Sequence, residues 1–90
     1  MSKELRTIRT LKLKIADTAT TLNALINYKM KDKDLHKKLK RSLSARLATL
    51  CAVYLSLTHD EATTNALRSY LLNTLPEPAA NYFITKLNIS

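Results

Sequence analysis

Apolar residues recur at steps of three and four positions along the first third of the chain. The members of this stripe are Ile8, Leu11, Ile15, Ala19, Leu22, Leu25 and Ile26. Such spacing places them on one face of an α-helix, which we expect to span residues 3–28. Ser2 is a suitable N-cap for this helix, and Glu4 lies in its first turn, where a negative charge interacts favourably with the helix dipole.

The middle of this predicted helix is its weak point. The segment from Asp17 to Thr21 contains one aspartate and three threonines, whose side chains compete for backbone hydrogen bonds. Two alternatives follow. The helix is either unbroken and roughly 40 Å long at about 1.5 Å per residue, or it is kinked or restarted at Asp17.

A polar stretch over residues 29–33 predicts a turn, and Asp32 or Asp34 can cap a second helix over 35–57. One face of its first half carries leucines: Leu35, Leu39, Leu43, Leu47 and Leu50. Its second half is apolar almost all round, which is typical of a helix that neighbours enclose. We therefore expect this half at the centre of the core or of an oligomer interface.

A capping box predicts the start of a third helix. Thr58-His59-Asp60-Glu61 matches the pattern S/T-x-x-E, so we expect a helix over 59–74. Pro76 disfavours helical backbone in the residue before it and ends this helix. Prolines are tolerated in the first turn of a short final helix over 77–87. The inward residues of this last helix would be Tyr82, Phe83 and Leu87.

The chain of 90 residues contains no glycine. Walker and dinucleotide-binding loops, and the RNA-binding loops of KH and RRM domains, need backbone that only glycine adopts at low cost, so these sites are excluded. Abundant Leu and Ala with few β-branched runs favour helix throughout. We predict an all-α fold for a single domain of residues 1–90, a small bundle of about four helices with a long N-terminal helical hairpin.

Positive charge is concentrated in the first half of the chain. Residues 1–46 hold thirteen of the fifteen Lys and Arg residues and four acidic residues, a net charge of +9, whereas residues 47–90 have a net charge of −1. Such asymmetry indicates that the first half faces a polyanion.

The densest basic run lies at the predicted turn and the start of the second helix. Its members are Lys29, Lys31, Lys33, Lys37, Lys38, Lys40, Arg41 and Arg46. Four of them share one solvent face: Lys33, Lys37, Lys40 and Arg41. A solubilising face usually carries Glu four positions from Lys, and none does so here, which favours a functional surface over a merely solvated one. Cations on one face can engage several phosphates and release their counterions.

We predict a nucleic-acid-binding site at this face, with two arginines of the first helix assisting. Its residues are Lys33, Lys37, Lys38, Lys40, Arg41, Arg6 and Arg9. A second basic cluster lies near the N-terminus and consists of Lys3, Arg6, Arg9, Lys12 and Lys14. In a hairpin that turns near Lys31, position 40 lies opposite about position 22, so this N-terminal basic cluster lies roughly 20 Å from the basic run of the second helix. The two clusters are therefore not one patch.

Four other residues invite a structural interpretation. Arg46 falls on the leucine face, and we expect a buried or interface arginine with Thr18 as its polar partner. Tyr28 is expected to pack at the helix end, with stacking on a base as the alternative. We expect Cys51 to be a small buried hydrophobe rather than a reactive thiol, and His36 to be a surface residue.

No residue pattern points to catalysis or to a metal. The sequence shows no nucleophile paired with a base and no isolated carboxylate pair in an apolar run. His59 lies beside Asp60 and Glu61, but the capping role explains this cluster and no further ligand is spaced for a metal. We expect no catalytic residue, no metal site and no cofactor.

The predicted function is that of a small basic, non-enzymatic protein that contacts the nucleic-acid phosphate backbone without sequence preference. It would act as a homo-oligomer or as a subunit of a larger nucleoprotein complex. The alternative is a protein-interaction module, a regulator, inhibitor or adaptor whose basic face docks an acidic protein surface.

Two other functions fit less well. A helix-turn-helix usually has glycine in its turn, and the turn before 59–74 has none. An interfacial membrane helix usually has boundary aromatics, which the basic second helix lacks. We expect neither a signal peptide nor a membrane span, and a single cysteine permits no internal disulfide, so we expect the cytoplasm.

Overall fold

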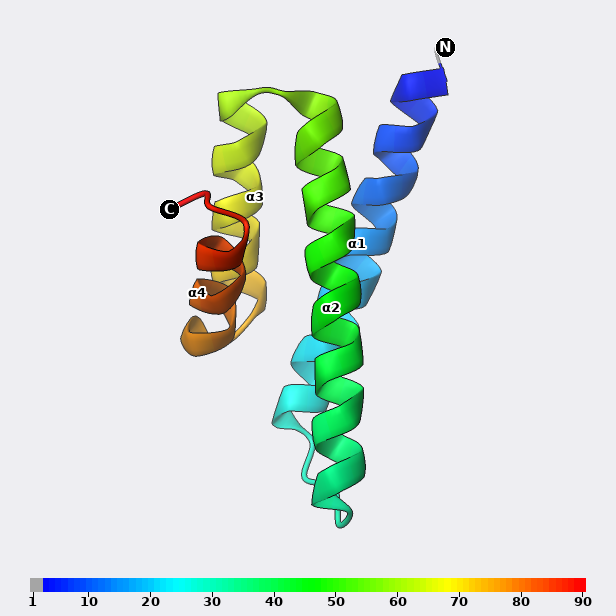
Figure 1. Cartoon of the computed structure of the whole chain (residues 1–90), viewed down its shortest axis with the longest axis vertical. Coiled ribbons are helices and arrows are strands. Elements are labelled where there is room, and N and C mark those ends of the chain that lie inside the picture. The colour runs from blue at the N-terminus through cyan, green and yellow to red at the C-terminus, as the bar shows by residue number, and fades with distance from the viewer. Residues whose placement is uncertain (1–2) are drawn as a thin grey trace.

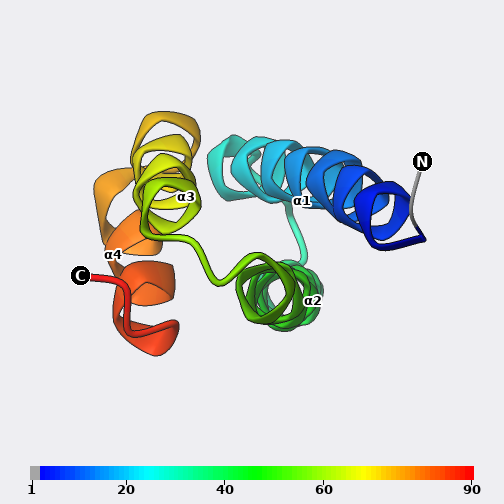
Figure 2. The ribbon, with the colours of Figure 1, turned by 90° about the horizontal axis from the view of Figure 1, so that it is seen from above.

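The computed structural model describes residues 3–90, and these residues form helices and no strand. The helices are α1 (Lys3–Asn27), α2 (Lys33–Thr58), α3 (Glu61–Thr74) and α4 (Glu77–Lys86). α1 and α2 form a long antiparallel hairpin, and the shorter α3 and α4 both lie on one side of it (Figures 1 and 2). The predicted all-α bundle with a long N-terminal hairpin is confirmed. The cap predicted at Ser2 lies outside the described residues, as does the side chain of Glu4.

α1 is continuous through the segment around Asp17, so the unbroken alternative is correct. The threonine side chains bond to the helix itself: Thr21 Oγ1 donates to the carbonyl of Asp17 at 2.8 Å. Thr7 Oγ1 donates in the same way to the carbonyl of Lys3 at 2.9 Å. A threonine hydroxyl that donates to a carbonyl of the preceding helical turn no longer competes for the hydrogen bonds of the helix backbone. The buried members of the predicted stripe are Leu11, Ile15, Ala19 and Leu22.

Asp32 is the cap of α2, which begins at Lys33. Its carboxylate accepts a hydrogen bond from the backbone N–H of Leu35 at 3.0 Å, as expected of an N-cap. His36, predicted at the surface, is half-buried because its Nε2 donates to the carbonyl of Leu25 at 2.6 Å. This bond joins the first turn of α2 to the last turn of α1, where carbonyls lack partners within the helix.

The capping box predicted at residues 58–61 is wrong. Thr58 is the last residue of α2 and therefore has the helical backbone that an N-cap lacks. His59 ends α2 in the left-handed region (φ 46°, ψ 35°), and its N–H donates to the carbonyl of Leu55 at 3.2 Å. Asp60 then caps α3, since its carboxylate accepts from the N–H of Ala62 at 3.2 Å.

Replacing His59 by glycine should stabilise the protein by about 0.5–1 kcal/mol. A left-handed backbone costs a residue with a Cβ roughly 1–2 kcal/mol, part of which glycine loses again through its greater freedom in the unfolded chain. The measurement is the free energy of unfolding from a urea titration. His59→Val is the control, and it should destabilise because a β-branched residue tolerates positive φ poorly. An unchanged free energy of unfolding in the glycine variant would contradict the left-handed backbone conformation at His59.

α4 begins at the predicted proline corner. Pro76 is its N-cap, and Pro78 lies in its first turn. At the other end Asn88 is left-handed (φ 57°), and the N–H of Ile89 donates to the carbonyl of Ile84 at 3.1 Å. This is the hydrogen bond of a Schellman-type helix end, at which glycine is the commonest residue and asparagine the usual substitute. A chain without glycine thus still ends its last helix sharply.

One cluster of buried apolar side chains draws on all four helices. Its most deeply buried large members are Phe83, Leu22, Leu47, Leu71 and Cys51. Burial raises the pKa of the Cys51 thiol to about 12, so the thiol stays protonated at neutral pH and cannot act as a thiolate nucleophile. The prediction of a buried hydrophobe at this position is confirmed.

The leucine face predicted for the first half of α2 is buried only in part. Leu35 and Leu39 are exposed, whereas Leu47 is buried, and Leu43 and Leu50 are half-buried and pack against the core. The buried face of α2 continues from Leu47 through Cys51 and Tyr54. The apolar second half of α2 is consequently enclosed on one side only, and Val53 remains exposed.

Two tyrosines expected in packed positions are exposed. Tyr82 keeps 51% of its surface accessible, because Phe83 and Ile84 take the inward positions of α4. Tyr28 keeps 64%, because α1 ends at Asn27 and the residue after it no longer continues the buried stripe.

Candidate nucleic-acid interface

A groove of about 570 Å³ lies where the last turns of α1, the first half of α2 and α4 meet. Its floor is apolar and includes Leu22 and Phe83, both almost fully buried. The cations that line it are Lys37, Lys40, Arg41 and Lys86. The groove therefore combines four positively charged side chains from two helices with an apolar floor.

The position of these cations follows from the buried face of α2. Counting back from Leu47 in steps of three and four leads through Ser44 to Lys40, and both side chains are half-buried. Residues at these steps lie on one face of a helix. The core-facing side of α2 thus becomes basic toward its N-terminus, and the groove lies where this change occurs.

The described lining of the groove carries positive charge alone. Among the lining residues that the structure describes there is no Asp or Glu. The Nζ of Lys86 lies 5.6 Å from the centroid of the Tyr82 ring, a cation–π distance that holds the ammonium at the rim. The Tyr82 ring in turn meets the Phe83 ring edge to face, with centroids 5.2 Å apart. Unpaired cations gathered on one concave surface create a potential that attracts polyanions.

The structure brings together three of the seven predicted site residues. Lys37, Lys40 and Arg41 line the groove. The other four are exposed and do not line it: Lys33, Lys38, Arg6 and Arg9. Lys12, from the N-terminal basic cluster, lines a different cavity, so the two basic clusters remain separate.

Lys86 and Tyr82 are the groove residues that sequence reasoning missed. Lys86 lies in the half of the chain with net negative charge, which gave no reason to join it to the basic run. One local signal was available, because Tyr82 and Lys86 are four residues apart and share a helix face. Only the packing of α4 against the hairpin shows that this face meets α2.

Arg46 is exposed, so the prediction that it is buried beside Thr18 is wrong, and the alternative of an interface arginine stays a prediction. Thr18 itself is buried, at 5% exposure. One residue further along α2 corresponds to about 100° of rotation, and it is Leu47 that takes the inward position.

Comparison with known proteins gives no relative for this chain. No family model matches it, and neither a curated protein nor a solved structure matches it. Over residues 3–90, no helix combines the length and the apolar character needed to cross a membrane. Nor do the described residues gather three His, Cys, Asp or Glu side chains that could hold a metal ion.

Proposed function

We propose that this protein is a non-enzymatic binding protein that holds the phosphate backbone of a nucleic acid in the groove between α1, α2 and α4. The observation that carries the proposal is the convergence of four cations on a surface whose described lining has no carboxylate. Phosphates recur along a strand, so several cations on one surface can engage several phosphates and release their counterions. Contacts of this kind position the backbone and carry no sequence information.

The remaining features of the groove suit the same ligand. The exposed ring of Tyr82 offers a face on which an unpaired base can stack. Lys33 and Lys38 are exposed on the same helix as Lys37 and can extend the contact along the strand. Arg6 and Arg9 lie on the first half of α1 and would contact only a nucleic acid long enough to extend beyond the groove. A subunit of a nucleoprotein assembly in a reducing cytoplasm, where Cys51 stays a free thiol, fits these properties.

The test is fluorescence anisotropy with a labelled single-stranded RNA and with a labelled DNA duplex, titrated at increasing salt. Four phosphate contacts predict a slope of log K against log salt of about −2.8 for the single strand and about −3.6 for the duplex. Scrambling the sequence at constant length should leave the affinity unchanged. Absence of binding at low salt, or a slope near zero, would sink the proposal.

A second candidate function is the docking of an acidic protein, and the open side of α2 favours it. Exposed apolar residues line this side: Leu35, Leu39, Val53 and Leu57. Arg46 lies midway between the first and the last of them, and one side of α2 faces none of the other helices (Figure 2). An antiparallel second copy would bring two Arg46 side chains together, so the better partner is a helix with an apolar face and a carboxylate.

The two candidates differ in what accompanies the purified protein. Nucleic acid that co-purifies and is removed by high salt supports the groove. Protein that is free of nucleic acid, and whose binding to an acidic partner is lost in Arg46→Glu, supports the second candidate.

A further inference from the structure

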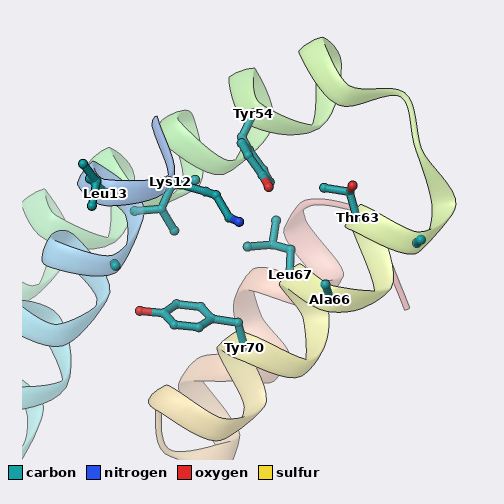
Figure 3. Close-up of a pocket in the computed structure, with 10 residues that line it drawn as sticks. Lys12, Leu13, Tyr54, Thr63, Ala66, Leu67 and Tyr70 are labelled. Atoms are coloured by element: carbon teal, nitrogen blue, oxygen red, sulfur yellow. The ribbon is translucent and has the colours of Figure 1, made fainter. Parts of the chain in front are cut away.

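A second cavity, of about 590 Å³, opens between α1 and α3 next to the C-terminal half of α2 (Figure 3). Small side chains on both sides leave the space open: Ala16 on α1, and Ala62 and Ala66 on α3. Leu67 and Ile15 are buried and form its apolar base. Volumes of about 300–1,000 Å³ with mostly apolar walls are typical of small-molecule sites.

The polar groups of this cavity come from three helices. Figure 3 shows the ammonium of Lys12 directed into the cavity, on the side where the hydroxyl of Tyr54 also points inward, with the ring of Tyr70 across the other end. Lys12 is the one charged side chain among the described residues that line it. Burial raises the pKa of Tyr54, so its phenol stays protonated at neutral pH and can donate a hydrogen bond.

This arrangement selects the chemistry of the ligand. An ammonium and a phenol donor together suit the oxygens of one carboxylate, since hydrogen bonds in which the donor or the acceptor is ionised are shorter and stronger than neutral ones. Among the described lining residues, this cavity offers a polyanion one cation, whereas the groove between α1, α2 and α4 offers four. The apolar walls, in contrast, suit a hydrocarbon or aromatic body.

We propose that the cavity between α1 and α3 binds a small amphipathic monocarboxylate, such as a medium-chain fatty acid. Its carboxylate contacts Lys12 and Tyr54, and its chain lies along Ala66 and Tyr70. The cavity and the nucleic-acid groove share no lining residue, so this proposal stands or falls independently of the proposed function.

The experiment is a titration of the isotopically labelled full chain with octanoate and, separately, with octanol, followed by backbone amide chemical shifts. Octanoate is expected to bind with a Kd of about 0.1–1 mM, an affinity in keeping with so small a ligand. It should bind about tenfold more tightly than octanol, because the alcohol lacks the charge that Lys12 pairs with. The shifts should appear in α1 and α3 around the cavity.

Three variants separate the parts of the site. Lys12→Gln should lose the tenfold preference for octanoate and keep the affinity for octanol. Lys14→Gln removes the same charge from an exposed position of the same helix outside the cavity, and it should keep the preference. Ala66→Leu fills the cavity from an exposed position and should weaken both ligands about tenfold or more.

Three results would overturn the proposal. Equal affinity of the wild-type chain for octanoate and octanol would assign the cavity to a neutral apolar group, such as a side chain of a partner protein. Equal losses in Lys12→Gln and Lys14→Gln would indicate attraction to net charge alone. Shifts confined to the residues around Leu22 and Lys86 would place octanoate in the basic groove instead.

Discussion

Replacing Lys37, Arg41 and Lys86 together by glutamine should weaken nucleic-acid binding on the order of 100-fold at about 0.1 M salt. Each phosphate contact on a DNA duplex contributes about 0.9 to the salt slope, so three lost contacts should lower the slope by about 2.7. The three side chains are exposed, and their exchange leaves the packing of the helices intact. Lys40 is kept because it is half-buried, and the aliphatic stem of such a lysine packs against apolar neighbours.

The matched control removes the same charge from outside the groove. Lys14, Lys29 and Lys31 are exposed and do not line it, and their replacement by glutamine lowers the net charge of +8 by the same three units. This control should lose less than about tenfold in affinity, because exposed charges that make no contact in the groove act only through a long-range attraction that 0.1 M salt weakens. Equal losses in the two variants would show that net charge, and not the groove, drives binding.

Phe83→Ala should lower the free energy of unfolding by about 3–5 kcal/mol. Phe83 is 1% exposed and anchors α4 to the common core, so its removal leaves a cavity beneath the basic groove. Since domains of this kind are stable by about 5–15 kcal/mol, the variant loses a large part of its stability. Its melting temperature should fall by roughly 12 °C or more, measured by circular dichroism at 222 nm.

The neighbouring ring provides the control for this variant. Tyr82 belongs to the same helix and contacts the ring of Phe83, but it is half exposed. Tyr82→Ala should therefore cost less than about 1 kcal/mol. Similar losses in the free energy of unfolding for the two variants would contradict the orientation of α4 that turns Phe83 inward and Tyr82 outward.

Local signals in the sequence predicted the helices and several of their ends. The stripe from Ile8 to Ile26 predicted α1 because a helical period is visible over many turns, and Asp32 and Pro76 mark real starts because their effects act on adjacent backbone. The capping box predicted at residues 58–61 was wrong because the end of α2 and the start of α3 share this short segment. How far α2 continues into it depends on the packing of α2, which a local sequence pattern does not report.

Periodicity, the absence of glycine and charge are properties of the chain alone, and they were enough to predict an all-α chain with a long hairpin and a strongly basic first half. The rotation of α2 about its own axis, in contrast, depends on which of its side chains pack against the other helices. Its first half offers a leucine face and a basic face, and the packing of Leu47, Cys51 and Tyr54 leaves Leu35 and Leu39 exposed and brings Lys37, Lys40 and Arg41 to the groove beside α4. Lys86 joins them through contacts distant in sequence, which periodicity does not encode.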